Sequence, residues 1–206
     1  MKKLFYLVVT VWSIFSCTYN TEKKLLANKT VVAIFDKAEI KDLSVIIDFF
    51  NKRICMNEQI EKGNITECYQ RYFRDLENIS PTKLWGLEIS FKEQLQLYHK
   101  ISDNTFNQIW VISEKKPRQY TFSLKGINLN LFGKYDKFLK EFGKECSIIK
   151  EINDTYHAIG SVGPGFWAIK LLENIEQMDD IRFQLVVAIH FLTLNDEVER
   201  FEKYYK

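Results

Sequence analysis

Residues 181–194 read Ile-Arg-Phe-Gln-Leu-Val-Val-Ala-Ile-His-Phe-Leu-Thr-Leu, the most apolar stretch of the chain after its first segment. Arg182 and His190 interrupt this stretch, which argues against a membrane span. Asp179 and Asp180 come just before it, where the dipole of a helix N-terminus favours negative charge. The stretch therefore predicts the central core helix of the domain.

Helical periodicity extends outward from this core on both sides. Apolar residues recur every three or four positions in several segments, as expected for amphipathic helices. Asp36 with Glu39 forms a capping-box pattern, and Ser90 with Glu93 repeats it. Further expected helices cover residues 36–54, 66–76, 90–101, 131–142, 148–159 and 166–175, with one more beginning at 80–81 and an exposed one over 195–205 that Asp196 and Glu197 would open.

The middle of the chain has the character of β-structure. Residues 108–113 are β-branched and aromatic, residues 119–125 alternate apolar with polar, and a charged turn, 114–118, lies between them. This pattern predicts one β-hairpin over residues 108–125. The expected fold is a single mainly α-helical domain of about seven or eight helices with this small hairpin. A length of 206 residues fits one domain.

The first segment of the chain carries a targeting pattern. Lys2 and Lys3 precede an apolar stretch of 12 residues, from Leu4 to Phe15. A bilayer span needs about 20 apolar residues, so this stretch is too short for a permanent helix. It has the length of the hydrophobic region of a signal peptide, roughly 7–15 residues. The chain turns polar immediately after Cys17.

The sequence Ile14-Phe15-Ser16-Cys17 resembles the lipobox of bacterial lipoproteins. In that family the cysteine sulfur receives diacylglycerol and the peptide is cut just before it. The resemblance implies a signal peptide over 1–16, a lipidated N-terminus and flexible tether over 17–34, and a helical domain over 35–206. It also implies an exported, lipid-anchored protein of the cell envelope, in the periplasm or on an outer-membrane leaflet. The alternatives are an ordinary signal peptide cleaved nearby or an N-terminal core strand.

The charge balance limits the partners. The chain holds 29 basic and 27 acidic residues, and removal of Lys2 and Lys3 with residues 1–16 leaves 27 of each. A nucleic-acid binder needs a surplus of basic residues on one face, so no nucleic-acid partner is expected. Membrane attachment is expected to come from the lipid on Cys17, because acyl chains contribute about 0.8 kcal/mol per buried CH₂.

Cysteine use fits an exported protein. Cys55 and Cys68 lie at the end of one expected helix and the start of the next, a separation that a disulfide can bridge. Cys146 would then remain as a buried free thiol. The alternative is three unpaired core cysteines. The chain has no CxxC or HxxxH spacing, so neither a zinc site nor a cofactor is expected.

Candidate chemistry is concentrated near the glycine-rich residues 160–165. His157 precedes this segment, and Ser161 follows the histidine by four residues. A serine nucleophile needs a base within hydrogen-bonding reach and a third group that orients the base, but no G-x-S-x-G motif or acidic partner is evident. Gly160–Gly165 also lacks the lysine of a phosphate-binding loop, which favours a helix–helix turn. Phe166 and Trp167 beside it could anchor a protein partner.

Small size, a neutral mature chain and high aromatic content favour a non-catalytic protein-interaction domain. One form of this hypothesis is an immunity protein that neutralises a toxin arriving in the periplasm. An envelope enzyme that uses His157 beside Gly160–Gly165 is an alternative from a different class. A third hypothesis is a small-ligand binder whose pocket is lined by Trp85, Trp110 or Trp167.

Overall fold

Residues 181–194 lie at the centre of the structure, in helix α10 (Ile181–Tyr205). The computed structural model describes residues 20–55, 65–77, 89–115, 124–160 and 169–205. The described part is mainly helical and contains one two-stranded antiparallel hairpin, which confirms the predicted fold class. The other elements are α2 (Lys29–Val32), α3 (Lys37–Ile54), α4 (Ile65–Glu77), α5 (Phe91–Tyr98), α6 (Asp103–Ile109), β1 (Trp110–Lys115), β2 (Leu124–Leu129), α7 (Lys134–Phe142), α8 (Ser147–Ile159) and a 3₁₀ helix (Ile175–Asp179).

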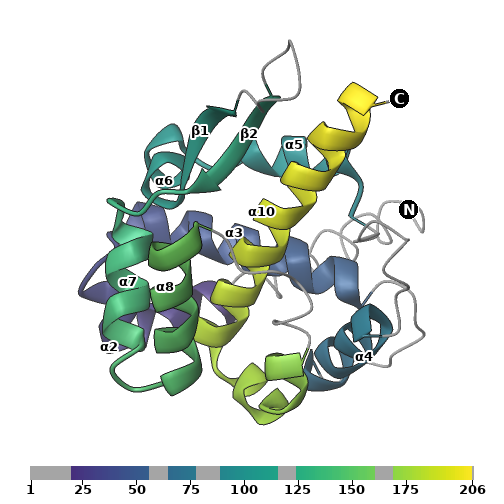
Figure 1. Cartoon of the computed structure of the whole chain (residues 1–206). Helices are drawn as coiled ribbons and strands as arrows, with labels where there is room; N and C mark the ends of the chain where they lie inside the picture. Colours follow the sequence, from purple (N-terminus) through teal and green to yellow (C-terminus); the bar gives the residue numbers. More distant parts are fainter. Residues whose placement is uncertain (1–19, 56–64, 78–88, 116–123, 161–168, 206) are drawn as a thin grey trace, which may run out of the picture.

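The other elements pack around α10 (Figure 1). Helix α10 runs diagonally across the molecule, with α3 behind it, α7 and α8 on one side and α4 on the other. A helix that is apolar all round must be buried all round, and this holds for its first half. Burial of each large apolar side chain contributes roughly 1.5–3 kcal/mol. The apolar residues of α10 that are at most 1% exposed are Phe183, Leu185, Val186, Val187, Ala188, Ile189, Phe191 and Leu192.

Helix α10 continues through the position where two helices were expected to meet. The prediction that Asp196 opens a separate exposed helix over 195–205 is wrong. The Asp196 side chain is fully buried, and its Oδ1 accepts a hydrogen bond of 3.2 Å from the backbone N–H of Ile127. Arg200 Nε lies 2.6 Å from the same oxygen, one turn further along the helix. The carboxylate therefore bonds a neighbouring strand instead of capping a helix.

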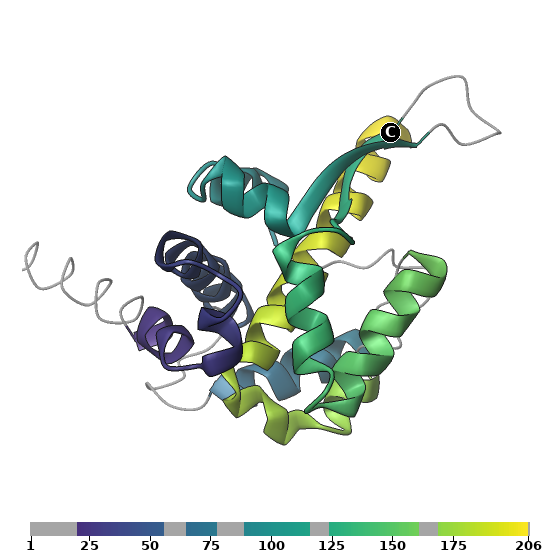
Figure 2. The ribbon, with the colours of Figure 1, turned by 90° about the vertical axis from the view of Figure 1, so that its left-hand side faces the viewer.

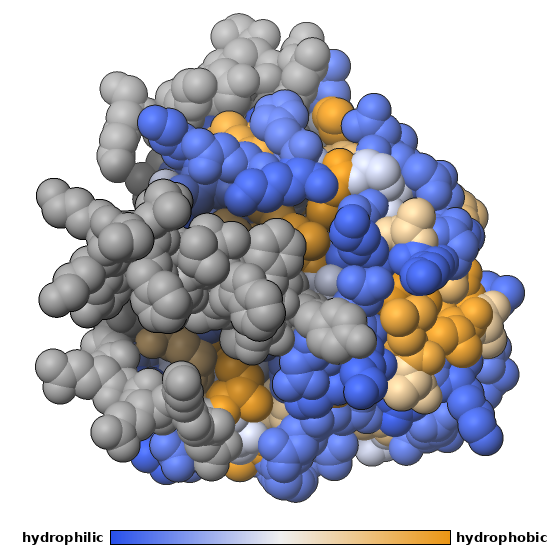
Figure 3. All heavy atoms as spheres, turned by 180° about the vertical axis from the view of Figure 1, so that it is seen from behind, coloured by the Kyte–Doolittle hydropathy of each residue, from blue (hydrophilic) through white to orange (hydrophobic). Residues whose placement is uncertain are grey.

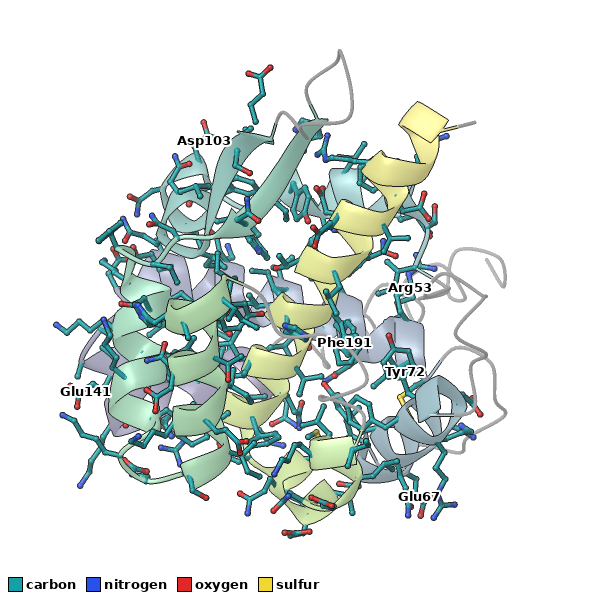
Figure 4. The ribbon with its side chains drawn as sticks, in the orientation of Figure 1. Arg53, Glu67, Tyr72, Asp103, Glu141 and Phe191 are labelled. Atoms are coloured by element: carbon teal, nitrogen blue, oxygen red, sulfur yellow. A yellow bond between two sulfur atoms is a disulfide. The ribbon has the colours of Figure 1, made fainter. Side chains whose placement is uncertain are left out.

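Helix α3 follows the prediction closely. Asp36 accepts hydrogen bonds from the N–H groups of Ala38 and Glu39, and the Glu39 carboxylate accepts from the Asp36 N–H, so the expected capping box is present. At the other end, Phe50 lies in an aromatic cluster that joins α3, α4 and α10. Tyr72 and Phe191 in this cluster have ring centroids 5.5 Å apart and lie close together in Figure 4.

Residues 20–34 are folded, which corrects the expectation of a flexible tether over 17–34. Residues 20–26 are helical, and α2 follows with Asn28 as its N-cap. Leu25 and Val31 are fully buried, and α2 packs against α3 and α7. The polar composition of this segment concealed the fact that a few apolar side chains are buried through contacts with distant elements. Residues 17–19 lie outside the described part of the chain.

The hairpin and the residues before it are shifted from the expected positions. Residues 103–109 form helix α6, with the Ser102 hydroxyl accepting from the Thr105 N–H, so the first strand starts at Trp110 instead of residue 108. The second strand is β2, and most of the expected strand 119–125 lies outside the described residues. Figure 2 shows the hairpin alongside the C-terminal half of α10, where Ile127 and Leu129 are buried.

Several helix ends also differ from the predictions. Helix α5 begins after Ser90 as expected, but the Ser90 side chain makes no capping bond, and the helix ends at Tyr98 instead of residue 101. In place of a continuous helix over 166–175, residues 169–172 are helical and a 3₁₀ helix follows at Ile175–Asp179. Gly160 ends α8 with a φ of 79°, a conformation that glycine adopts without steric cost. The helix expected from residues 80–81 lies outside the described part.

Candidate functional site

A helical hairpin of α7 and α8 brings Asp136 and His157 together. Gly143 occupies the turn between the helices, where an added Cβ would lie 3.0 Å from the carbonyl oxygen of Leu139 and 3.1 Å from the Cα of Lys150. The absence of a side chain there lets the turn approach the start of α8 closely. The chain then folds back, which places the last turn of α8 beside the first turn of α7.

The Asp136 carboxylate makes bonds through both of its oxygens. His157 Nε2 lies 2.6 Å from Asp136 Oδ1, and Lys140 Nζ lies 2.6 Å from Oδ2. The Asp136 side chain is 8% exposed, whereas that of His157 is 37% exposed. The Nε2 edge of the imidazole ring is therefore bonded to a buried acid, while other parts of the His157 side chain are exposed to solvent.

This pair can orient a proton acceptor. An ionised carboxylate only accepts hydrogen bonds, so the Nε2–H of His157 donates to Asp136 and Nδ1 of the neutral ring is left as the acceptor. Such a pair supplies the base and the orienting acid of a nucleophilic site. A complete site also needs a hydroxyl or thiol within reach of Nδ1. Ser161, which the sequence suggested for that role, lies outside the described residues.

A shallow depression runs along the neighbouring face of α8. It has a volume of about 440 Å³, and its lining includes Lys150, Glu151 and Asp154 but not His157. Lys150 Nζ lies 2.7 Å from Asp154 Oδ2, and Lys170 Nζ lies 3.6 Å from Glu151 Oε2. The charged groups of this face are thus paired with one another. The imidazole of His157 therefore does not line this depression.

His190 is a hydrogen-bonded core residue. It is 2% exposed, and its Nδ1 shares a hydrogen bond with the Tyr156 hydroxyl of α8. Burial lowers the pKa of His190 well below its ordinary value and raises the pKa of Tyr156. Both side chains are therefore neutral at physiological pH, and they connect α8 to α10.

Two of the cysteines are joined by a disulfide. Cys55 follows the last residue of α3, Cys68 lies in the first turn of α4, and their Cα atoms are 5.3 Å apart. The bond connects helices whose aromatic side chains already pack together. Cys146 is a free thiol and is half-buried instead of fully buried.

The remaining candidates fall into two groups. Cys17, Ser161, Gly165, Trp85 and the proposed anchor residues Phe166 and Trp167 lie outside the described part of the chain. Trp110 is described and fully buried, and its indole N–H donates a bond of 2.8 Å to Thr193 Oγ1. Trp110 is therefore a core residue instead of the wall of a ligand pocket.

An ion pair between the buried Glu39 and the partly exposed Lys134 was not foreseen from the sequence. Glu39 is 1% exposed, and Lys134 Nζ lies 2.6 Å from its Oε2 while Asn104 Nδ2 donates to its Oε1 at 3.0 Å. This carboxylate joins the starts of α3, α6 and α7. The capping-box pattern identified Glu39 as a helix residue, but no local signal connects residue 39 with residue 134.

The described helices and side chains set further bounds. Across the described ranges, no three His, Cys, Asp or Glu side chains are grouped so that they could hold a metal ion. In the same ranges, none of the helices has the length and apolar character needed to cross a bilayer. Fold and site together define a mainly helical domain with a small hairpin and an Asp–His pair at its surface. No protein-family model matches the sequence, and no curated protein or solved structure is significantly similar to it.

Proposed function

We propose that this protein is a bacterial lipoprotein, anchored in the cell envelope through lipid on Cys17, whose helical body binds another protein without catalysing a reaction. The observation that carries the anchoring part is the sequence around Cys17, where Ile14-Phe15-Ser16-Cys17 resembles a lipobox. Cys17 lies three positions before Asn20, the first described residue, and Thr21 and Leu25 just beyond it are buried in the folded body. The 16 residues before Cys17 have the pattern of a signal peptide.

The disulfide supports a location outside the cytoplasm. Disulfides form and persist in oxidising compartments such as the bacterial periplasm and are rare in the cytosol. The Cys55–Cys68 bond connects two helices of the described core, so it belongs to the folded protein. A lipoprotein acquires such a bond after export.

The binding part of the proposal rests on the hairpin. Ile112 in β1 is 73% exposed and its neighbour Val111 is 39% exposed, although both are large apolar residues. Within the described part of the chain, β1 pairs only with β2, so its other edge has backbone groups that another strand could pair with. Exposed apolar residues on such an edge favour a protein partner, and a toxin neutralised by an immunity protein is one form of it.

Mass spectrometry of the N-terminus tests the anchoring. The full chain, produced in a bacterium with a C-terminal tag, should yield a mature protein that starts at Cys17 and carries diacylglycerol and an N-acyl chain such as palmitate. Cys17→Ser is the matched control, and it should remove the lipid and release the protein from the membrane fraction. An intact Met1 with an unmodified thiol at residue 17 would contradict the proposal.

Cross-linking in cells tests the binding. A photo-crosslinking residue at position 112 should produce one defined adduct, whereas the same residue at the exposed Asp154 on α8 should produce none of that mass. Ile112→Glu should abolish capture of the partner by the purified protein without changing its melting temperature. Equal labelling from both positions would remove the support for a partner at the hairpin.

A second candidate function follows from the Asp136–His157 bond. The 2.6 Å contact is the arrangement that a hydrolase uses to orient its base, and it favours the envelope-enzyme alternative at His157 and Gly160–Gly165. Hydrolysis of a panel of activated esters measures this. His157→Gln and Asp136→Asn should each reduce turnover at least tenfold, while Lys140→Gln, which removes the other partner of Asp136, should not. Equal background rates in all four proteins would exclude the esterase form.

A further inference from the structure

Residues 20–32 expose both apolar and basic side chains on the surface of the protein. In the helix over 20–26 and in α2, the side chains of Leu25 and Val31 point into the core. Leu26 and Val32 are 38% and 46% exposed, so two large apolar side chains stay on the outside. Figure 3, seen from behind, shows apolar side chains gathered among hydrophilic ones on the side of the molecule where α2 lies in Figure 1.

The same face is basic. Lys23, Lys24 and Lys29 are exposed, and within the described residues none of them forms an ion pair. Glu22 is the only acidic residue between residues 20 and 35, so this segment has a charge of +2. The chain that starts at Cys17 is neutral as a whole, with 27 basic and 27 acidic residues. The segment next to the expected anchor therefore carries net positive charge although the chain as a whole is neutral.

The distance to Cys17 leaves little freedom. Asn20 lies three positions after Cys17, and an extended chain spans at most about 3.3–3.6 Å per residue, which gives roughly 10–11 Å. The headgroup layer on each side of a bilayer is about 5–8 Å thick, from a total of 40–45 Å around a hydrocarbon core of 30 Å. A lipid on Cys17 would hold residue 20 within about one protein-helix diameter of that layer.

From these observations, and resting on the lipid anchor argued above, we infer that the face made by Lys23, Leu26, Lys29 and Val32 lies on anionic lipid headgroups. Lysines beside exposed aliphatic side chains are the composition of helices that lie in the membrane interface. The lysines would contact phosphate groups, and Leu26 and Val32 would enter the boundary of the acyl chains. The body would then have a fixed orientation, with the hairpin at the end away from the membrane (Figures 1 and 2).

The experiment uses the full lipidated protein, purified from membranes and reconstituted in vesicles of phosphatidylethanolamine and phosphatidylglycerol. An environment-sensitive fluorophore is attached at Val32→Cys or, as the matched control, at Ile112→Cys, both in a Cys146→Ser background. The label at 32 should shift its emission to shorter wavelength and be quenched by lipids that carry a nitroxide on the acyl chain. The label at 112 should show neither effect, although Ile112 is the more exposed apolar residue.

Charge reversal separates the contributions. Lys23→Glu with Lys29→Glu changes only exposed side chains, so the fold should be retained while quenching at position 32 falls towards the value in vesicles of neutral phosphatidylcholine. A lipidated protein whose label at position 32 stays in water overturns this inference alone and leaves the face open to a protein partner. An unmodified Cys17, seen by mass spectrometry of the same preparation, overturns the anchor and this inference together.

Discussion

The hydroxyl of Thr21 donates a hydrogen bond of 2.6 Å to Oδ1 of Asp48, which connects the first described helix to the middle of α3. Asp48 is half-buried, and its other oxygen, Oδ2, has no hydrogen-bond partner within the described residues. A carboxylate in this position is costly when ionised, because one of its oxygens loses water without gaining a donor. The contact between the N-terminal segment and α3 therefore depends on a side chain, Asp48, that can gain or lose a proton.

Asp48→Asn should stabilise the protein at neutral pH. Burial raises the pKa of Asp48 above its ordinary value of 3.8, so the folded state binds a proton more readily than the unfolded state does. This group's contribution to stability is then largest below pH 3.8 and is lost as the pH rises through the folded pKa. Asparagine keeps an oxygen for Thr21 but carries no charge. Urea unfolding should show a larger free energy of unfolding for the variant at pH 7, and the difference should shrink as the pH falls through the folded pKa of Asp48 towards 3.8. A difference that stays constant with pH would contradict this assignment.

His190→Gln should flatten the dependence of stability on pH in mild acid. Burial lowers the pKa of His190 well below 6.5, so the unfolded state binds the proton more readily than the folded state does. Stability is therefore complete above pH 6.5 and falls as the pH drops below it. Melting temperatures from pH 7 to pH 5 measure the effect. Tyr156→Phe serves as the control, because it removes the hydrogen bond but leaves the imidazole buried, and it should keep the steep profile of the wild type.

The fold was predictable where local pattern and burial agree. Helix α3 has a capping box at its start and an apolar stripe along its length, and it was found within one residue at each end. Helix α10 was identified as the core because its first half has no polar face. Short elements were not predictable, since α6 with seven residues and α2 with four offer too few turns for a period to be seen. Their positions depend on burial against other elements.

Only one residue of the Asp136–His157 pair could be predicted from the sequence. The position of His157 beside the glycines made it a candidate base. Its partner Asp136 lies 21 residues earlier in the chain, on another helix. Whether an acid meets the imidazole depends on how α7 and α8 fold back, and that is set by Gly143 and the packing of both helices. The wrong prediction for Asp196 has the same cause. Its bond to the Ile127 N–H forms because β2 lies beside α10, and no local sequence pattern indicates that arrangement.

Asp196→Ala should destabilise the protein by about 1–3 kcal/mol, the cost of a buried polar group that loses its partner. The Ile127 N–H would have no acceptor in a buried position, since its bond to Asp196 Oδ1 crosses between strand and helix. Denaturant unfolding gives the free energy, and hydrogen exchange at the Ile127 amide gives the local effect. Asp196→Asn is the matched control, because its amide oxygen can still accept from that N–H, and it should protect the amide better than alanine does. Equal exchange in both variants would argue against the bond.

Cys55→Ser should lower the free energy of unfolding by about 3 kcal/mol, the value that chain entropy assigns to closing a loop of this size. The bond spans 13 residues of sequence and joins α3 to α4, so its loss also frees the aromatic cluster between these helices. A reductant should lower the melting temperature of the wild type and leave that of the variant unchanged. Cys146→Ser is the control, because this thiol is unpaired and its loss should not alter the response to reductant. Equal sensitivity of Cys55→Ser and wild type to reductant would mean that Cys55 and Cys68 are not the pair that stabilises the fold.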